Sequence, residues 1–440
     1  MAEFSALYIP ATTGTFHMET AEEQFRKSVA ALKGISDKII CPEEKLIGSD
    51  TVKAFVEDRQ VDLVIFQNLT FANGAFISEV LKALPHTFVL LWTLREPVID
   101  GGRLRLNSLT GAYSAANTMM NFGRDRFSYL FGAPDDERTI KELSTIIKAA
   151  ELIHNMHGIK LAAIGQTPQG FGFGRALDAE LMSVFGVELE AIEARQLITM
   201  AKSYTDEEAA PYLEKTACAT CGLETIPLKN RMDHARLYMA YTEYIKQNNI
   251  GAIASRCWPD FFTEFGTPVC TVLSMLNDDK IPSACECDVY GALSMWIGMQ
   301  LSDSPVFFGD PVSLDEGENS ITFWHCGAAA CSLAREDTGA VIGVHPNRKI
   351  GPAMDFGCQK CDGATIFRIG RLRDGSFRFF IEEGSILDKP KQFTGTSVVV
   401  KTDGDARQIV ESSVKAGYEP HFVVIKGRHK AELEAIFEML

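Results

Sequence analysis

The stretch Val61-Asp-Leu-Val-Ile-Phe66 decides the fold class of the first part of the chain. It is a strand-sized, mostly apolar run, and the runs at Ala6–Ile9 and Thr87–Trp92 have the same character. Amphipathic helical patterns separate these runs. Continuous apolar runs that alternate with helices are typical of a parallel sheet covered on both faces. We therefore expect an α/β domain with a parallel sheet over residues 1–157.

The same alternation starts again further along the chain. Leu161–Ile164, Val187–Ile192 and Ile250–Ala254 are apolar runs, and helical patterns lie between them. This arrangement predicts a second α/β domain with a parallel sheet over residues 158–304.

The pattern changes after about Pro305. Short β-prone runs such as Ile321–Trp324 and Phe377–Ile381 follow at close spacing, and Arg373-Asp-Gly375 is a hairpin signal between two of them. We expect a mostly antiparallel, β-rich domain over residues 305–440. The predicted fold class is thus two parallel-sheet α/β domains followed by an antiparallel β domain.

The composition is that of a globular protein and argues against several functions. Of the 440 residues, 46% are hydrophobic and 23% are charged, a balance that favours a folded core. The formal net charge is −15 and no basic tract occurs, so we expect no nucleic-acid partner. No run approaches the roughly 18–20 apolar residues of a membrane helix, so we expect no membrane association. The 11 cysteines are an odd number, and with no secretory signal they favour the reducing cytoplasm.

Two cysteine pairs and a glycine-rich loop carry weaker signals. Cys218-Ala-Thr-Cys221 and Cys358-Gln-Lys-Cys361 are CxxC pairs, but they lie too far apart in the sequence for a zinc ribbon. The loop Gly165–Gly174 follows an apolar run, yet its glycine spacing matches no nucleotide-binding motif. We expect this loop to allow the close approach of a ligand or of a neighbouring backbone.

Four residues at the ends of apolar runs form the strongest set of candidate catalytic groups. They are Glu286, Asp310, His325 and His421. The ends of strands are where α/β sheets place functional side chains. Two carboxylates and two imidazoles form a mixed oxygen and nitrogen set that suits a divalent metal such as Mn²⁺.

The motifs around these residues resemble the L-fucose/L-arabinose isomerase family. The resemblance is carried by Cys257-Trp-Pro259, Gly266–Cys270, Ala284–Gly291, Gly309-Asp-Pro311, His325-Cys-Gly327 and Pro420-His421. It implies that Glu286, Asp310 and His421 hold a catalytic Mn²⁺ or another divalent metal, together with His325, which is either a further ligand or a contact to the substrate. It also implies that Glu286 and Asp310 transfer protons, and that the chain forms a homo-oligomer, either a trimer or a hexamer.

The resemblance implies a metal-dependent aldose–ketose isomerase, an intramolecular oxidoreductase of carbohydrate metabolism. The expected substrate is a hexose, a pentose or a derivative, and the reaction moves a proton through an enediolate. One alternative is an isomerase of an anionic sugar such as sulfoquinovose, which would give sulfofructose. An alternative of another class is a sugar-binding module without catalysis.

Residues near the motifs are candidates for contact with the substrate. We expect Arg256, Trp258 and Lys426 to contact the sugar. An anionic sugar would need a cation, because guanidinium groups bind oxyanions in a two-pronged geometry. The basic residues near the motifs are Arg256, Arg348, Lys349, Lys426 and Arg428.

Overall fold

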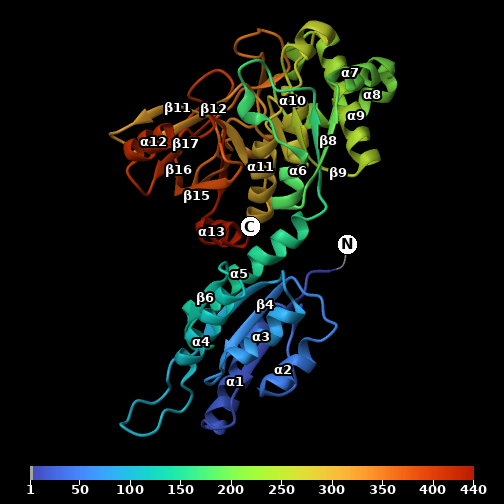
Figure 1. Ribbon diagram of the computed structural model, residues 1–440. Coiled ribbons are helices and arrows are strands. Elements are labelled where there is room, and N and C mark those ends of the chain that lie inside the picture. The colour runs from blue at the N-terminus through green and yellow to red at the C-terminus, as the bar shows by residue number, and fades with distance from the viewer. Residues whose placement is uncertain (1–2) are drawn as a thin grey trace. The chain divides into compact units, whose positions relative to one another are not determined.

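The structure, a computed structural model, describes residues 3–440 and divides the chain into two compact units (Figure 1). The first unit comprises Met1–Asn155 and Ala431–Leu440, and the second comprises Met156–Lys430. The three-domain division expected from the sequence stays a prediction.

The first unit contains a six-stranded parallel sheet in the order β2-β1-β4-β5-β6, with β3 beside β1. Its strands are β1 (Ala6–Thr12), β2 (Ile39–Ile40), β3 (Leu46–Ile47), β4 (Leu63–Asn68), β5 (Phe88–Thr93) and β6 (Ser128–Phe131). Along β1, Leu7 and Ile9 join one apolar cluster whereas Ala6 and Tyr8 join another. Both faces of the sheet are therefore buried, which explains the continuous apolar runs.

Six helices accompany this sheet. They are α1 (Met18–Ile35), α2 (Ser49–Val56), α3 (Gly74–Ala83), α4 (Ser108–Asn121), α5 (Glu137–Met156) and α13 (Lys430–Met439). Helix α13 is contributed by the end of the chain. Arg126 Nη2 donates to the carbonyl of Phe437 at 3.1 Å, and Ser128 hydrogen-bonds to Glu438. The C-terminal helix thus belongs to the first unit, although it follows the β-rich part of the sequence.

The second unit begins with a parallel sheet in the order β10-β9-β7-β8. Its strands are β7 (Lys160–Ile164), β8 (Glu188–Ile192), β9 (Ile250–Ser255) and β10 (Ser283–Cys285). The helices of this part are α6 (Asp178–Glu180), α7 (Ala194–Ser203), α8 (Asp206–Ala219), α9 (Leu228–Asn248), α10 (Cys270–Asp278) and α11 (Val289–Ser302), with short turns η1 (Gly172–Gly174), η2 (Leu181–Phe185), η3 (Leu223–Thr225) and η4 (Phe261–Phe265). Almost every residue of α11 is buried.

The rest of the second unit is a closed antiparallel barrel in the order β11-β12-β17-β16-β15-β18. Its strands are β11 (Phe307–Asp315), β12 (Ser320–His325), β15 (Cys361–Arg371), β16 (Phe377–Ile386), β17 (Thr396–Thr402) and β18 (Phe422–Lys426). The predicted turn Arg373–Gly375 joins β15 to β16. Helix α12 (Ala406–Lys415), turn η5 (Cys331–Leu333) and the small pair β13 (Ile342–Gly343) and β14 (Ala353–Met354) complete this part. Two parallel α/β sheets followed by antiparallel β structure confirm the predicted fold class.

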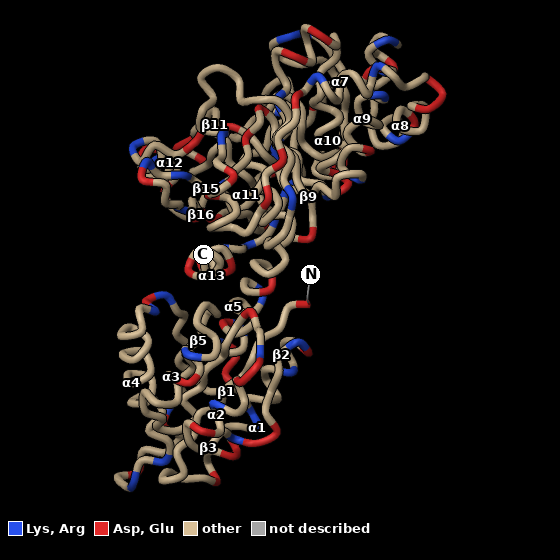
Figure 2. Tube along the Cα trace, turned by 45° about the vertical axis from the view of Figure 1, so that its right-hand side comes forward, with Lys and Arg blue, Asp and Glu red and all other residues tan. Residues whose placement is uncertain are grey.

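Charged side chains are distributed along both units. Figure 2 shows acidic and basic residues interspersed through each of them. None of the helices within residues 3–440 combines the length and the apolar character that a membrane span requires.

Candidate active site

The turn between β10 and α11 presents Glu286. Both Glu286 and Cys287 adopt left-handed backbone conformations, with φ of 60° and 56°. Non-glycine residues rarely adopt this conformation, and it occurs most often where a site constrains the chain. Asp288 then begins the helix, because its side chain accepts a hydrogen bond from the Gly291 amide at 2.9 Å. The turn therefore places a carboxylate directly beyond the carboxyl end of the strand.

Three neighbouring barrel strands bring the other predicted groups to the same place. Strand β11, which carries Asp310, pairs with β12 on one side and with β18 on the other. In these ladders Asp310 lies opposite Trp324, next to His325, and Gly309 lies opposite Phe422, next to His421. Residues far apart in sequence thus share one end of the barrel.

The four predicted groups converge around His421. Its Nε2 lies 3.0 Å from Glu286 Oε2 and 3.5 Å from Asp310 Oδ1. Within residues 3–440, the group of three side chains that could hold a metal is Glu286, His325 and His421, whose ligand atoms lie within 4.8 Å of one another. Asp310 borders this group rather than joining it.

A buried ion pair fixes the orientation of His421. Its Nδ1 lies 2.9 Å from Asp288 Oδ2, so the Nδ1–H donates to this carboxylate and Nε2 faces Glu286. Arg368 donates to both oxygens of Asp288, at 2.6 and 3.0 Å. Asp288 and Arg368 are both fully buried. A carboxylate that orients an imidazole in this way is the usual support of a metal-binding histidine.

The pKa values of the four side chains are shifted in different directions. Burial opposes the charged form of Glu286, but the hydrogen bond from His421 and the nearby imidazoles outweigh burial and lower the pKa of Glu286. Burial raises the pKa of Asp310, and His421 and His325 only partly offset this effect. Burial lowers the pKa of His325. Burial also opposes protonation of His421, yet its bonds to Asp288 and Glu286 raise its pKa to about 9.

The donor set fits a divalent metal. His325 is buried, and its Nδ1 has no hydrogen-bond partner among residues 3–440. A buried nitrogen without a partner is costly unless a ligand satisfies it. One carboxylate and two imidazoles suit Mn²⁺ and similar ions. A metal held by three protein ligands would keep coordination positions open for a substrate.

The residues predicted to contact the sugar lie at different places. The Nε1 of Trp258 donates to Glu286 Oε1 at 3.2 Å. Arg256 lies beside the same segment and pairs through Nε with Asp260 at 2.8 Å. Lys426 ends β18, and the length of that strand separates it from His421. The structure thus brings Trp258 to the cluster and puts Lys426 at the other end of the strand.

Aromatic rings form one wall beside the cluster. The ring of Phe173 lies edge-on to His421 with centroids 5.3 Å apart, and Phe171 contacts both Phe173 and Trp258, at 5.3 and 5.8 Å. These phenylalanines come from the loop Gly165–Gly174. A Cβ at Gly174 would lie 3.0 Å from the Cα of Asp288, which confirms the predicted close approach to a neighbouring backbone.

Several supporting residues were missed by sequence reasoning. Asp288 carries the signal of a helix N-cap, and Arg368 is a single charge within the apolar run 364–370 of β15. His345 is also buried near the cluster, and burial lowers its pKa to about 4. The CxxC cysteines do not belong to the metal group found within residues 3–440.

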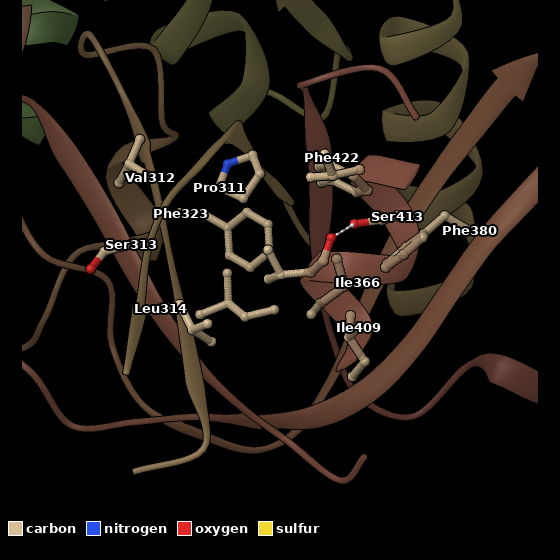
Figure 3. Close-up of a pocket in the computed structure, with 13 residues that line it drawn as sticks. Pro311, Val312, Ser313, Leu314, Phe323, Ile366, Phe380, Ile409, Ser413 and Phe422 are labelled. Carbon is tan, nitrogen blue, oxygen red and sulfur yellow. Dashed lines mark hydrogen bonds between the residues drawn. The ribbon is translucent and has the colours of Figure 1, made fainter. Parts of the chain in front are cut away.

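A separate apolar cavity of about 240 Å³ lies in the barrel. Figure 3 shows Phe323, Ile366 and Phe380 of the barrel facing Ile409 and Ser413. None of its lining residues is charged, and none belongs to the cluster. This cavity therefore does not suit a polar sugar.

Comparison with known proteins identifies close relatives. A sulfoquinovose isomerase of Clostridium sp. (strain MSTE9) is 58% identical over 443 residues, covering 100% of this chain and 98% of the relative. The sulfoquinovose isomerase of Priestia aryabhattai is 36% identical over 449 residues, with the same coverage of both chains. That of Alkalicoccus urumqiensis is 35% identical over 442 residues, covering 98% of this chain and 97% of the relative. No model of a known protein family matches the chain.

These relatives confirm the expected sugar isomerase, an intramolecular oxidoreductase, but they correct the expected family. The resemblance to the L-fucose/L-arabinose isomerase family is wrong, because the full-length relatives carry another name. The motifs that carry the resemblance surround side chains that suit a metal and the carbonyl end of a sugar. These side chains do not indicate which substituents the rest of the sugar carries. At 58% identity over its full length, the chain belongs to the sulfoquinovose isomerase family.

Proposed function

We propose that the protein interconverts sulfoquinovose and sulfofructose. Its relatives at 58% and 36% identity are named for this aldose. The observation that carries the proposal is the cluster of Glu286, His325 and His421 within 4.8 Å, in a chain related to those enzymes over its full length. The anionic sugar thus replaces the neutral hexose or pentose as the preferred substrate.

Glu286, His325 and His421 would hold a divalent metal such as Mn²⁺, with Asp310 at its border. When bound, such a metal stabilises negative charge that develops on two neighbouring sugar oxygens. Asp288 holds the Nδ1–H of His421 and so keeps Nε2 turned toward Glu286. The fully buried Arg368 keeps Asp288 charged and in place.

The two carboxylates would move the proton between C2 and C1. Glu286 has a lowered pKa and is ionised at neutral pH, so it can take the proton from C2. Asp310 has a raised pKa and holds a proton more readily, so it can return one at C1. Environments that push two carboxyl pKa values apart are typical of acid–base pairs. The hydroxyl proton moves from O2 to O1, and proton exchange between the carboxyls restores both.

The test is turnover of defined sugars by the purified protein. Sulfoquinovose, glucose, L-fucose and L-arabinose are incubated with the enzyme, and ketose formation is followed by NMR after chelation and after Mn²⁺ is restored. We expect sulfofructose, loss of activity on chelation and recovery with the metal. Glu286→Gln removes the base at constant size and should lower kcat about 1,000-fold. Sugar binding without turnover by any metal-loaded sample would instead indicate a non-catalytic module.

Self-association as a trimer or hexamer also stays a prediction, and so does the cytoplasmic location. The expected oligomer came from the family resemblance that the relatives correct. Light scattering coupled to gel filtration measures the number of subunits directly.

A further inference from the structure

The sulfonate of the proposed substrate needs a binding partner that Glu286, His325 and His421 do not provide. Sulfoquinovose carries its sulfonate on C6, at the opposite end of the carbon chain from the reacting C1 and C2. Glu286 and Asp310 are negative and cannot hold this group. A cation at some distance from the cluster is required, because a buried or half-buried oxyanion needs a charged or hydrogen-bonded partner.

Three basic residues near the motifs are unsuited to this role. Arg428 pairs with Asp403 and also lies 3.4 Å from Glu383. Arg256 is held by Asp260 at 2.8 Å, and its Nε also donates to the carbonyl of Trp258 at 3.0 Å. Lys426 lies at the end of β18 away from His421.

Arg348 differs from these residues in its position and in its pairing. Its guanidinium carbon lies 5.6 Å from the ring centroid of Trp258. The same indole donates to Glu286 at 3.2 Å. The indole ring of Trp258 therefore contacts both Arg348 and Glu286, one of the proposed metal ligands. None of the ion pairs formed among residues 3–440 includes Arg348, so its charge is available to a ligand.

The loop around Arg348 is anchored at its base. The buried His345 accepts hydrogen bonds at Nδ1 from the amides of Asn347 and Arg348, both at 3.2 Å. The ring of Phe262 packs edge-on against His345 at 5.1 Å and lies 5.9 Å from the Arg348 guanidinium. The backbone of Arg348 is thus fixed, whereas its side chain is exposed above two aromatic rings.

We infer that Arg348 binds the sulfonate of the substrate and thereby determines its specificity. The inference rests on the proposed function. A guanidinium donates two parallel hydrogen bonds to two oxygens of an oxyanion, which a neutral CH₃ group at C6 cannot accept. Trp258 would lie under the sugar between its two ends, since aromatic rings pack against apolar surfaces of ligands.

Arg175 is the competing cation. It donates through Nε to Thr167 at 2.9 Å and lines a cavity of about 290 Å³ near Phe173. Glu419 lines the same cavity, and its buried Oε2 has no hydrogen-bond partner among residues 3–440. Arg371 lines this cavity too, but it pairs with Glu180 at 2.6 Å. The carboxylate of Glu419 repels a sulfonate, so the surroundings of Arg175 favour Arg348 as the binding residue.

The experiment compares two substrates that differ only at C6. The values of kcat/KM for sulfoquinovose and for 6-deoxyglucose are measured for wild-type protein, Arg348→Gln, Arg348→Lys and Arg175→Gln. Arg407→Gln on α12 is the matched control, because that arginine is exposed and pairs with Glu316 and Glu411. Arg348→Gln should lose about 100-fold in kcat/KM on sulfoquinovose. Its change on 6-deoxyglucose should stay within about threefold.

The remaining variants define the outcomes. Arg348→Lys should lie between wild type and Arg348→Gln, since lysine keeps the charge but not the two-pronged geometry. An equal loss on both sugars, no loss at all, or a selective loss only in Arg175→Gln would overturn the assignment to Arg348. If wild-type protein does not turn over sulfoquinovose, the proposed function itself fails, which is a different result from an unaffected Arg348→Gln.

Discussion

His421 is the residue on which the site depends. It is fully enclosed, yet it contacts three acids: Glu286, Asp288 and Asp310. Two of these contacts are to Nε2 and one is to Nδ1. One imidazole therefore couples the proposed metal ligands to the buried ion pair behind them. Substitutions of Asp288 or Arg368 should therefore change the orientation of His421 and, with it, the proposed metal site.

We predict that Asp288→Asn weakens both the fold and the metal site. The amide keeps the shape of the side chain but leaves Arg368 buried without a counter-charge, which costs about 3–5 kcal/mol of unfolding free energy. Metal affinity should fall about 10–100-fold, because the orienting carboxylate of His421 is lost. Urea unfolding and calorimetric metal titration measure the two effects. Asp303→Asn, whose carboxylate pairs with Lys280 at the surface, is the control, and equal effects in both variants would contradict the prediction.

The pKa of His421 predicts how stability depends on pH in metal-free protein. The folded value is about 9, whereas an unfolded histidine titrates near 6.5. Between these values the folded state binds more protons, so the stabilising contribution of His421 is complete below about pH 6.5 and is lost as the pH rises through about 9. Burial lowers the pKa values of His234, His325 and His345, so these groups are neutral in the folded state across this window. Their unfolded forms still bind protons near pH 6.5, which opposes the effect of His421 there, and they lose these protons by about pH 7.5.

Urea unfolding in the presence of a chelator should therefore give a falling free energy between about pH 7.5 and 9. The variant His421→Gln has no such proton and should show a flatter profile. Identical slopes in the two proteins would assign the pH dependence to other groups.

At the scale of elements, helix α11 sets the position of the site. Its N-cap is Asp288, and it passes close to the barrel at two glycines. A Cβ at Gly291 would lie 2.6 Å from the ring of Phe308 and 2.8 Å from the carboxyl carbon of Asp288. A Cβ at Gly298 would lie 2.9 Å from the side chain of Ile425. Both contacts are tight, but only the first involves a residue of the site.

We predict that Gly291→Ala and Gly298→Ala separate stability from activity. Each adds a methyl group to a packed core and should cost about 1–3 kcal/mol of unfolding free energy. Gly291→Ala should also lower kcat, because Asp288 must move and His421 moves with it. Gly298→Ala displaces Ile425, whose Cγ1 and Cδ1 would lie 2.9 and 3.0 Å from the added methyl group, and touches no residue of the site, so it should keep kcat. Thermal melting and steady-state kinetics test this difference, and a similar loss of kcat in both variants would refute it.

The strands of the first unit were predictable because burial on both faces leaves a continuous apolar run. The run starting at Val61 predicts β4, but the strand begins at Leu63. Asp62 explains the offset: its carboxylate accepts the Ser5 amide at 2.9 Å and contacts His154 at 2.7 Å. Arg368 was not predictable, because a charge in a strand indicates a solvent-facing position until the barrel closes around it.

Across the whole molecule, the sequence predicts the side chains of the proposed metal site better than the residues that orient them. Glu286 and His421 stand at the ends of apolar runs, and that local rule singles them out. The pairing of Asp288 with Arg368 joins two residues far apart in sequence, and no local rule connects them. Likewise, the helical pattern of Lys430–Met439 predicts a helix, but only tertiary contacts assign α13 to the first unit.

Metal binding should stabilise one unit selectively. The proposed ligands lie on the β10–α11 turn, on β12 and before β18, all within the second unit. A metal at 100 times its Kd stabilises the state that binds it by about 2.7 kcal/mol. With Mn²⁺ in place of chelator, hydrogen exchange should slow in peptides that span these three segments. Peptides from β1 and β4 of the first unit should exchange at the same rate in both samples.

Glu286→Gln supplies the control for this experiment, because it removes a charged ligand while leaving His325 and His421 in place. Its second unit should show little or no protection by Mn²⁺, whereas its first unit should match wild type. Protection that spreads equally over β1, β4 and the barrel would mean that the metal acts at another site or that the two units unfold as one. Protection retained in Glu286→Gln would remove that carboxylate from the ligand set and leave the two imidazoles with a different acid.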